Sequence, residues 1–299
     1  MLSFITWTVD PEIFTIGGVT LRWYGLLWVC AIYAAWKIVT KTFKHEYEGY
    51  PEEWDYKLFN YGAIGLIVGA RLGHCLFYGA NDDFFHYYRN PIELIYIWEG
   101  GLSSHGGAFG LLIAMYLYNK NVTKKGYLWI LDRLVIGVAI GGALIRLGNL
   151  MNHEIYGHAT DVPWAFRFIL NIHSWQNGAA PIFSQPSHPT QIYEMLYCLI
   201  TFAVLMYLYW KTKVAQKEGL IFGIFLVGIF LTRFFLEFIK ENQVEFENTM
   251  TLKMGQLLSI PFFLLGFYLI FRNKTAHQSI PNQNNKLKTV PKRKYNPKV

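Results

Sequence analysis

One short segment, residues 145–157, gathers several chemically useful side chains at the end of a long apolar stretch. Arg146, Asn149 and Asn152 recur at spacings of three, which places them on one face of a helix. Glu154 follows two residues later, near enough to orient the Arg146 guanidinium. Arginine is costly in hydrocarbon, so a chain keeps one there only where an anion or water meets it. This cluster is the predicted centre of the chemistry.

Two further cations lie in apolar stretches with polar neighbours. Arg71 stands three residues before His74, on one helical face and beside small residues that allow close packing. Arg233 and Glu237 stand at positions i and i+4, where they can form an ion pair. A structural ion pair of this kind is the alternative to a catalytic role for Arg233.

A histidine framed by glycines lies in the third apolar stretch. Gly100 and Gly101 precede His105 at a short distance, and Gly106 and Gly107 follow it directly. Glycine lets a backbone approach a ligand closely or bend within the membrane. A lone buried histidine is usually structural, but the glycine frame at membrane depth favours a functional one.

Two other polar groups border apolar stretches. Tyr24 follows Arg22 near the start of the first stretch, where an aromatic belt with a snorkelling arginine is the alternative to a functional role. At the start of the fifth stretch, His188, Gln191 and Glu194 recur at spacings of three and are predicted to face one side of a helix. Helix capping would explain their position but not three polar groups on one face.

Together these residues predict a polar cavity that opens outward and binds an anion. Guanidinium groups at membrane depth suit a phosphate, and the phosphate most available there is a phospholipid headgroup. The sequence contains no zinc-binding HExxH pair, no glycine-rich nucleotide loop and no GxSxG nucleophile motif. Metal, nucleotide and serine-nucleophile chemistry are therefore unsupported, and the three cysteines, odd in number and all in apolar stretches, predict no disulfide framework or metal site.

The elements that position these residues are predicted to be membrane-spanning helices. Of the 299 residues, 53% are hydrophobic and only 16% are charged, a composition typical of an integral membrane protein. The fold class predicted is all-α and polytopic, with about seven spans. These cover roughly residues 19–39, 58–78, 93–118, 127–150, 190–210, 220–239 and 255–271. Glycines interrupt the third, which is predicted to be broken or re-entrant.

The distribution of Lys and Arg predicts how the chain is oriented. Most of the 27 fall in alternate connections and in the tail, so by the positive-inside rule the N-terminus is outside and the C-terminus cytoplasmic. We expect a transmembrane catalytic domain over residues 1–272, with an extracytoplasmic loop at about 151–187. Residues 273–299 are expected to form a basic, disordered cytoplasmic tail. Its charge favours anionic lipid headgroups over nucleic acid.

The motifs together resemble one family, the prolipoprotein diacylglyceryl transferases of bacterial lipoprotein maturation. The resemblance covers about four-fifths of the chain. It rests on residues 23–25, 101–107, 146–157, 160–164, 188–194, Arg233 with Glu237, and 254–261. The chain departs from the usual pattern at Ser104, Ile145, Leu150, Ile229 and Lys240. These changes bear on packing and secondary contacts more than on chemistry.

The resemblance implies an enzyme of the bacterial plasma (inner) membrane. It would transfer the sn-1,2-diacylglyceryl group of phosphatidylglycerol to the lipobox cysteine thiol of a prolipoprotein signal peptide, forming a thioether and releasing glycerol phosphate. The expected partners are these two substrates and membrane lipids, with no nucleic acid. No metal or organic cofactor is needed, because the phosphodiester already has a leaving group.

Within that reaction the residues acquire expected roles. His105 is the candidate base for the thiol, and Arg146 and Arg233 are the candidates to stabilise the leaving phosphate. Tyr24 would orient the headgroup or relay a proton. Asn149 and Glu154 would fix Arg146 and the glycerol hydroxyls. Additional lipid-binding or supporting contacts are expected from Arg71, Asn152, Gly157 and Glu237.

The alternative is a transporter or flippase for an anionic lipid or solute, with the arginines lining a pathway. Such proteins are commonly built from internal repeats. The segment around Arg146 has no counterpart in the other half of the chain, so the sequence favours the transferase.

Overall fold

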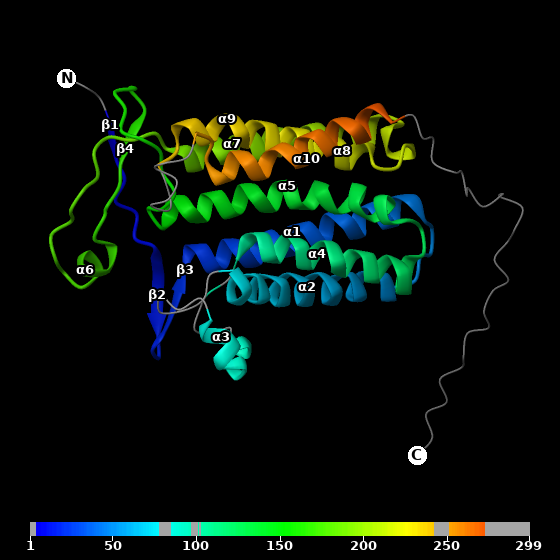
Figure 1. Cartoon of the computed structure of the whole chain (residues 1–299), viewed down its shortest axis with the longest axis horizontal. Helices are drawn as coiled ribbons and strands as arrows, with labels where there is room; N and C mark the ends of the chain where they lie inside the picture. Colours follow the sequence, from blue (N-terminus) through cyan, green and yellow to red (C-terminus); the bar gives the residue numbers. More distant parts are fainter. Residues whose placement is uncertain (1–3, 78–84, 97–100, 102, 242–250, 273–299) are drawn as a thin grey trace, which may run out of the picture.

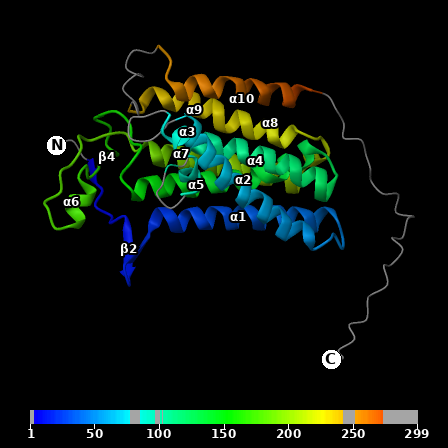
Figure 2. The same cartoon turned by 60° about the horizontal axis from the view of Figure 1, so that its bottom comes forward.

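The computed structural model describes residues 4–77, 85–96, 101, 103–241 and 251–272. Long helices lie side by side along one axis, and short strands and loops gather at one end of them (Figures 1 and 2). The helical elements are α1 (Trp23–Glu46), α2 (Glu53–Phe77), α3 (His86–Arg89), η1 (Pro91–Ile95), α4 (Ser104–Tyr118), η3 (Asn119–Thr123), α5 (Tyr127–Met151), α6 (Ile172–Gln176), α7 (Thr190–Lys211), η4 (Val214–Gln216), α8 (Leu220–Leu226), η5 (Val227–Leu231), α9 (Thr232–Leu236), η6 (Glu237–Ile239) and α10 (Met254–Phe271).

Five segments are long and apolar enough to cross a membrane. They are α1, α5, α7, α10 and the segment Leu220–Ile239, which joins α8, η5, α9 and η6. The chain is therefore mostly helical with five candidate spans. The other two predicted spans, 58–78 and 93–118, correspond to α2 and α4, which do not meet those limits of length and composition.

Two boundaries of the prediction were wrong. The first span was expected from Val19, but residues Val19–Arg22 form strand β3 and the helix begins at Trp23. The third was expected from Glu93, yet η1 ends at Ile95 and α4 begins only at Ser104. The interruption predicted from the glycines thus separates two elements. The predicted tail, residues 273–299, lies outside the described residues.

The described chain is also not purely helical. Strand β1 (Phe4–Thr6) pairs in parallel with β4 (Ala165–Arg167), and β2 (Glu12–Ile16) pairs antiparallel with β3 (Val19–Arg22). The β1–β4 pair ties the start of the chain to the long loop after α5. A small cluster of Leu150, Phe166 and Phe168 packs beneath that loop. These elements cover the end of the bundle where α5 finishes and α4 and α7 begin (Figure 1).

Small residues set the closest helix packing, between α2 and α4. Gly65, Gly69 and Gly73 recur every four residues on α2 and face Gly106 and Gly110 on α4. A Cβ added at Gly69 would lie 2.7 Å from the Gly110 Cα, so the two backbones touch. Helices in lipid associate through such close packing, because apolar side chains gain little by leaving lipid for protein. The glycine pattern therefore fixes where α4 begins, and with it the height of His105.

Helix α5 is the central helix of the bundle. Its candidate span is 67% buried, against 28–33% for the other four. Near its start, Trp129 stacks on Phe43 at 5.5 Å, and Trp54 meets Phe43 edge-on at 5.4 Å. This aromatic cluster stabilises the end of the bundle opposite to the strands. At the other end, the last turn of α5 carries Arg146 and Asn149 into the region covered by the loops.

Candidate functional site

The candidate site lies at the end of the bundle that carries the strands. Helices α1, α4 and α7 begin there and α5 ends there, so residues distant in the sequence meet in their terminal turns (Figure 1). Tyr24 is in the first turn of α1, His105 in that of α4 and Arg146 in the last turns of α5. Arg233 follows in α9. The residues predicted for the site therefore lie at the same end of the bundle.

Arg146 is held by a carboxylate and an amide. Its Nε lies 2.8 Å from Oε2 of Glu194, and its Nη1 donates to Oδ1 of Asn149 at 3.1 Å. Glu194 is completely buried, whereas the Arg146 side chain remains 20% exposed. The guanidinium has five N–H donors in a planar fork, and these contacts use only some of them. Arg146 is therefore fixed in orientation and still has donors available for an anion.

The sequence suggested that Glu154 orients the Arg146 guanidinium directly, but the structure shows an indirect contact. Its Oε1 accepts from Nδ2 of Asn149 at 2.8 Å and from Nδ2 of Asn152 at 3.3 Å. The order of contacts is thus Arg146, Asn149, Glu154. The i, i+3 spacing placed Asn149 next to Arg146 correctly, while the chain leaves the helix before Glu154. The carboxylate consequently orients the amide that orients the arginine.

The turn that carries Glu154 is strained and is held from the neighbouring helix. His153 and Ile155, on either side of it, both have positive φ values, 57° and 61°. A left-handed conformation is unfavourable for a β-branched residue. Gln191 Nε2 donates to the Glu154 carbonyl at 2.6 Å, and Thr190 Oγ1 donates to the Ile155 carbonyl at 2.7 Å. Helix α7 thereby maintains the turn that presents Glu154.

A second buried cation completes the charge balance around Glu194. Lys240 Nζ lies 3.2 Å from Glu194 Oε1 and 3.9 Å from Glu237 Oε2, and all three side chains are buried. Buried ions need such partners, because leaving one uncompensated is strongly destabilising. Glu237 pairs here with Lys240, and the Arg233–Glu237 ion pair, the alternative to a catalytic role for Arg233, is not formed between these two described residues. In the 3₁₀ turn η6, residues three apart are aligned, which favours the Glu237–Lys240 pair.

Arg233 is half-buried and differs from the other arginines in its surroundings. Among the residues that the structure describes, none forms a hydrogen bond or ion pair with its guanidinium. It follows the π-helical turn η5, a distortion frequent at functional sites. Its charge acts on His105 and, together with that of Arg146, on Tyr197. The two arginines are therefore near the same tyrosine, and Arg233 is available to a ligand.

His105 and Tyr24 approach from the remaining two helices. His105 is exposed in the first turn of α4, which Ser103 caps by accepting from the Gly106 N–H at 3.3 Å. Tyr24 packs against Gly148 of α5, where an added Cβ would lie 2.8 Å from the tyrosine Cδ2. The charges of Arg146 and Glu154 both act on the Tyr24 phenol. An imidazole and a phenol thus border the two guanidinium groups.

Arg71 was expected to bind the lipid or to support the site, and in the structure its guanidinium holds the segment that precedes His105. It donates to the carbonyls of Glu93 at 2.6 Å, Leu94 at 3.1 Å and Gly101 at 3.4 Å. Arg71 is almost fully buried. Its observed contacts anchor η1 and Gly101 against α2 and do not include the Arg146 cluster.

Gly157 also has a packing role where lipid contact was expected. It is buried, its N–H donates to the His188 carbonyl at 2.9 Å, and its backbone bridges to Lys240. A Cβ there would lie 2.8 Å from the Thr190 side chain. Only glycine leaves room for this backbone crossing. The crossing connects the Arg146 segment to the residue that neutralises Glu194.

Of the three polar residues predicted on one face of the fifth span, two face the site from the helix and one lies outside the helix. Gln191 and Glu194 turn toward Glu154 and Arg146, as described above. His188 lies outside the helix, which begins at Thr190, and its Nδ1 is 3.2 Å from the Tyr193 hydroxyl. The helical spacing therefore failed at His188 because the helix had not yet started.

His153 supports the site from the loop side. It is buried, its Nδ1 accepts from the Ile169 N–H at 3.1 Å, and its Nε2 lies 2.8 Å from the Val9 carbonyl. Accepting at Nδ1 leaves the proton on Nε2, which donates to Val9. Burial lowers the pKa of this imidazole below its usual value. The neutral ring therefore joins the first residues of the chain to the loop beside Glu154.

Sequence reasoning did not select three residues of the site, Glu194, Lys240 and Tyr197. Glu194 was noticed as one of the polar residues at the start of the fifth span, but its pairing with Arg146 could not be derived from spacing. Lys240 was noted only as a departure from the family pattern, and the structure shows that it is buried. The available signal was the polar stripe of α7, in which Gln191, Glu194 and Tyr197 recur every three residues.

Comparisons with known proteins show the family to which the chain is similar. The family model described as prolipoprotein diacylglyceryl transferase matches residues 11–272. A relative from Porphyromonas gingivalis, named phosphatidylglycerol–prolipoprotein diacylglyceryl transferase, is 46% identical over 90% of this chain and 95% of its own length. Relatives of the same name from Chloroherpeton thalassium and Tolumonas auensis are 40% and 37% identical, over 91% and 88% of this chain and 95% of each relative.

Proposed function

The chain belongs to the prolipoprotein diacylglyceryl transferase family, and on that premise we propose the reaction that it catalyses. It transfers the sn-1,2-diacylglyceryl group of phosphatidylglycerol to the lipobox cysteine thiol of a prolipoprotein. The observation that carries the proposal is the position of His105, Arg146 and Arg233 at one end of the helical bundle, where Glu194 and Asn149 fix the Arg146 guanidinium. Two cations at one end of the bundle suit an anionic headgroup better than an uncharged substrate.

The chemistry needs one bond to form and one to break. The cysteine sulfur forms a thioether bond to the glyceryl carbon that carries the phosphate ester. The carbon–oxygen bond of that ester breaks, its electron pair stays on the phosphate oxygen, and glycerol phosphate leaves. The thiol proton is taken up by a base. No oxidant or reductant enters, so the substrates balance the reaction by themselves.

His105 is the proposed base. A free thiol has a pKa of about 8.5, so removal of its proton assists the attack. An exposed imidazole at the start of α4 is accessible to a peptide arriving from that end of the bundle.

Arg146 and Arg233 are proposed to divide the work on the phosphate. Arg146, fixed by Glu194 and Asn149, binds the headgroup in a set orientation. Arg233, with no partner among the described residues, stabilises the charge that develops as the ester bond breaks. Tyr24 orients the headgroup beside Arg146. Asn152, Glu154 and Glu237 act indirectly, through Asn149 and Lys240.

The finer membrane arrangement is also part of the proposal. Helices α2 and α4 cross the bilayer with the five candidate spans, and the strand-bearing end faces outward. The concentration of Lys and Arg in alternate connections supports this orientation. Residues 1–272 form the catalytic domain, with residues 273–299 as a cytoplasmic tail, and the enzyme resides in the bacterial plasma membrane. The lipid then enters from the outer leaflet and the signal peptide from the outer face.

A single assay separates this function from transport. Purified protein is incubated with phosphatidylglycerol and a lipobox peptide, and the peptide mass is measured. A gain of one diacylglyceryl group supports the transferase. Alkali should then remove the ester-linked acyl chains and leave the glyceryl thioether on the peptide. Movement of lipid between leaflets of a proteoliposome without any modified peptide would favour the transporter. A peptide in which serine replaces the cysteine is the matched control.

A further inference from the structure

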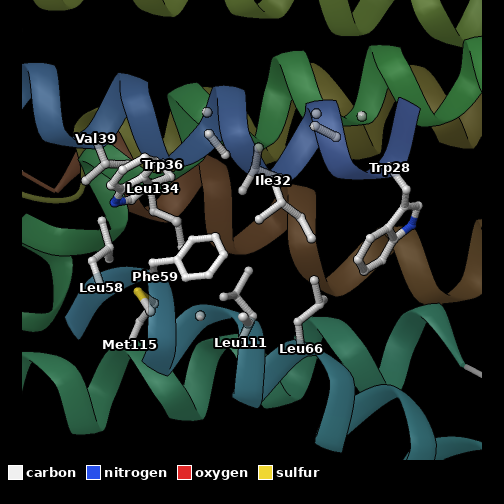
Figure 3. A pocket seen from close by; sticks show the side chains of 18 of the residues that line it. Trp28, Ile32, Trp36, Val39, Leu58, Phe59, Leu66, Leu111, Met115 and Leu134 are labelled. Atoms are coloured by element: carbon white, nitrogen blue, oxygen red, sulfur yellow. The ribbon is translucent and has the colours of Figure 1, made fainter. Parts of the chain in front are cut away.

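A narrow apolar cavity runs between two pairs of helices. Helix α1 packs on α5 and α2 packs on α4, while contacts between the two pairs are few. The cavity between them has a volume of about 240 Å³ and an almost entirely apolar lining. Trp28 and Leu66 lie toward one end, and Val39, Leu58 and Met115 lie toward the other (Figure 3). The residues described so far for the reaction do not explain this space.

One end of the cavity adjoins the candidate site. Ile145 lines it, and the next residue is Arg146. Trp28 lies one helical turn beyond Tyr24 on α1. A lipid whose phosphate contacts Arg146 has its glycerol at this end, and its acyl chains must then extend away from the polar groups. The cavity is the apolar space next to that point.

The depth of the cavity matches one leaflet. From Trp28 to Val39, α1 rises by about 16 Å, at 1.5 Å per residue. From Ile145 back to Leu134, α5 covers the same rise of about 16 Å. Half of a hydrocarbon core of about 30 Å is about 15 Å, the depth that one acyl chain occupies. Two antiparallel helices thus give the same length.

The far end of the cavity is closed by packed side chains. Val39, Leu58, Met115 and Leu134 are buried in the same cluster as the stacked aromatic pair described above. Packed cores yield little to insertion, because extra methylenes force strained rotamers and backbone shifts. The Phe59 ring packs edge-on against Trp36 at 5.9 Å and lines the cavity just before this end. The packed side chains therefore limit how far an acyl chain can extend into the cavity.

We infer that this cavity between α1, α2, α4 and α5 holds one acyl chain of the donor lipid and selects its length. The inference rests on the proposed function, since it concerns the same lipid. A chain that ends at Phe59 fills the cavity. A longer one must displace packed side chains, and a shorter one leaves apolar surface unburied. The selection for chain length is measured as the kcat/KM for long-chain phosphatidylglycerol divided by that for short-chain phosphatidylglycerol.

Two substitutions move the end of the cavity in opposite directions. Gly62 lines it, and an added Cβ would meet Leu111 and Met115 at 3.8 and 3.9 Å, which are ordinary contacts. Gly62→Leu therefore fits its helix and projects into the space. Phe59→Ala removes a ring that is 42% exposed, so we expect a smaller loss of stability than for a buried aromatic residue. Val68→Phe, on the outer face of α2 at 49% exposure, is the matched control outside this cavity.

The test measures kcat/KM for phosphatidylglycerols with chains from dioctanoyl to dioleoyl, with one lipobox peptide. We expect Gly62→Leu to lower the long-to-short ratio about tenfold, the effect of losing burial of about two methylenes. Phe59→Ala should raise the ratio, and Val68→Phe should leave it unchanged. If Gly62→Leu does not fold, Phe59→Ala alone tests the inference: a higher long-to-short ratio supports it, and an unchanged or lower ratio contradicts it.

Three outcomes would overturn the inference. Equal losses at every chain length would show that the cavity does not read length. A change confined to KM for the peptide would assign the cavity to the signal peptide. An unchanged ratio in both variants would assign no substrate to it. If the wild type modifies no peptide with any lipid, the proposed function fails instead. The acyl chains of lipid that copurifies with each variant then test the cavity by themselves.

Discussion

Glu194 lies 2.8 Å from Arg146, and this ion pair joins the last turns of α5 to the first turn of α7. The same carboxylate contacts Lys240 at 3.2 Å through its other oxygen. One fully buried anion therefore fixes the arginine of the central helix and neutralises the lysine that directly follows η6. Both the orientation of Arg146 and the stability of this end of the protein depend on it.

Removing the charge of Glu194 should harm stability as well as activity. We expect Glu194→Gln to lower the free energy of unfolding by about 3–5 kcal/mol, since it leaves Arg146 and Lys240 without their shared partner. Replacing the lysine too, in Glu194→Gln with Lys240→Met, should recover part of that loss. Thermal unfolding in detergent measures both. Losses that simply add in the double variant would contradict the shared pairing.

Arg233 should show the opposite pattern, with activity lost and stability kept. Because no described residue pairs with its guanidinium, Arg233→Gln should leave the unfolding temperature nearly unchanged. It should lower kcat/KM about 10²–10³-fold, as deletion of a contact to developing charge does. Arg71→Gln is the matched comparison, because Arg71 donates to three backbone carbonyls and its loss should destabilise the fold. A large drop in stability for Arg233→Gln would argue against a ligand-binding role.

Gly148 should act through Tyr24. A Cβ at this position would lie 2.8 Å from the tyrosine ring, so Gly148→Ala must displace the ring or the helix. We expect a loss of activity similar to that of Tyr24→Phe, if the phenol orients the headgroup. The double variant should then be no worse than Tyr24→Phe, which a double-mutant cycle on kcat/KM would measure. Fully additive losses would mean that Gly148 serves some other contact.

The long loop after α5 should become less stable in acid, because it contains the buried imidazole of His153. Burial lowers the pKa of this imidazole below the usual 6.5, so as the pH falls below 6.5 the unfolded chain binds a proton that the folded chain does not. The free energy of unfolding therefore decreases from pH 7 toward pH 5. His153→Gln should be less stable at pH 7 by about 1–3 kcal/mol, as for a buried hydrogen-bonding group left unsatisfied. Its melting temperature should depend less on pH than that of the wild type, and equal slopes would contradict this assignment.

The sequence predicted the helical membrane architecture because apolar runs are a local signal. It also predicted the contact of Arg146 with Asn149, since both lie on one face of one helix. The first residue of a helix was harder to predict. Helix α4 starts at Ser104, later than the predicted third span, whereas α7 starts at Thr190 as predicted, so that His188 of the polar pattern lies outside the helix.

Partners from different helices could not be predicted from spacing. Glu194 and Lys240 meet Arg146 and Glu237 because α5, α7 and η6 pack together, which no local pattern encodes. The glycine frame of His105 was correctly seen as unusual, but its cause is tertiary. Gly106 allows α4 to touch α2 at Gly73, and this contact sets the position of the histidine.

The central claim is that Arg146 and Arg233 act on one headgroup, and a structure of the protein with bound phosphatidylglycerol tests it most directly. The account predicts a single phosphate with oxygens at about 2.7–3.2 Å from both guanidinium groups. Its glycerol should face His105, and the same phosphate should be absent from the Arg146→Gln and Arg233→Gln double variant. A phosphate bound by only one of the two arginines, with the other directed toward a separate protein partner, would contradict it.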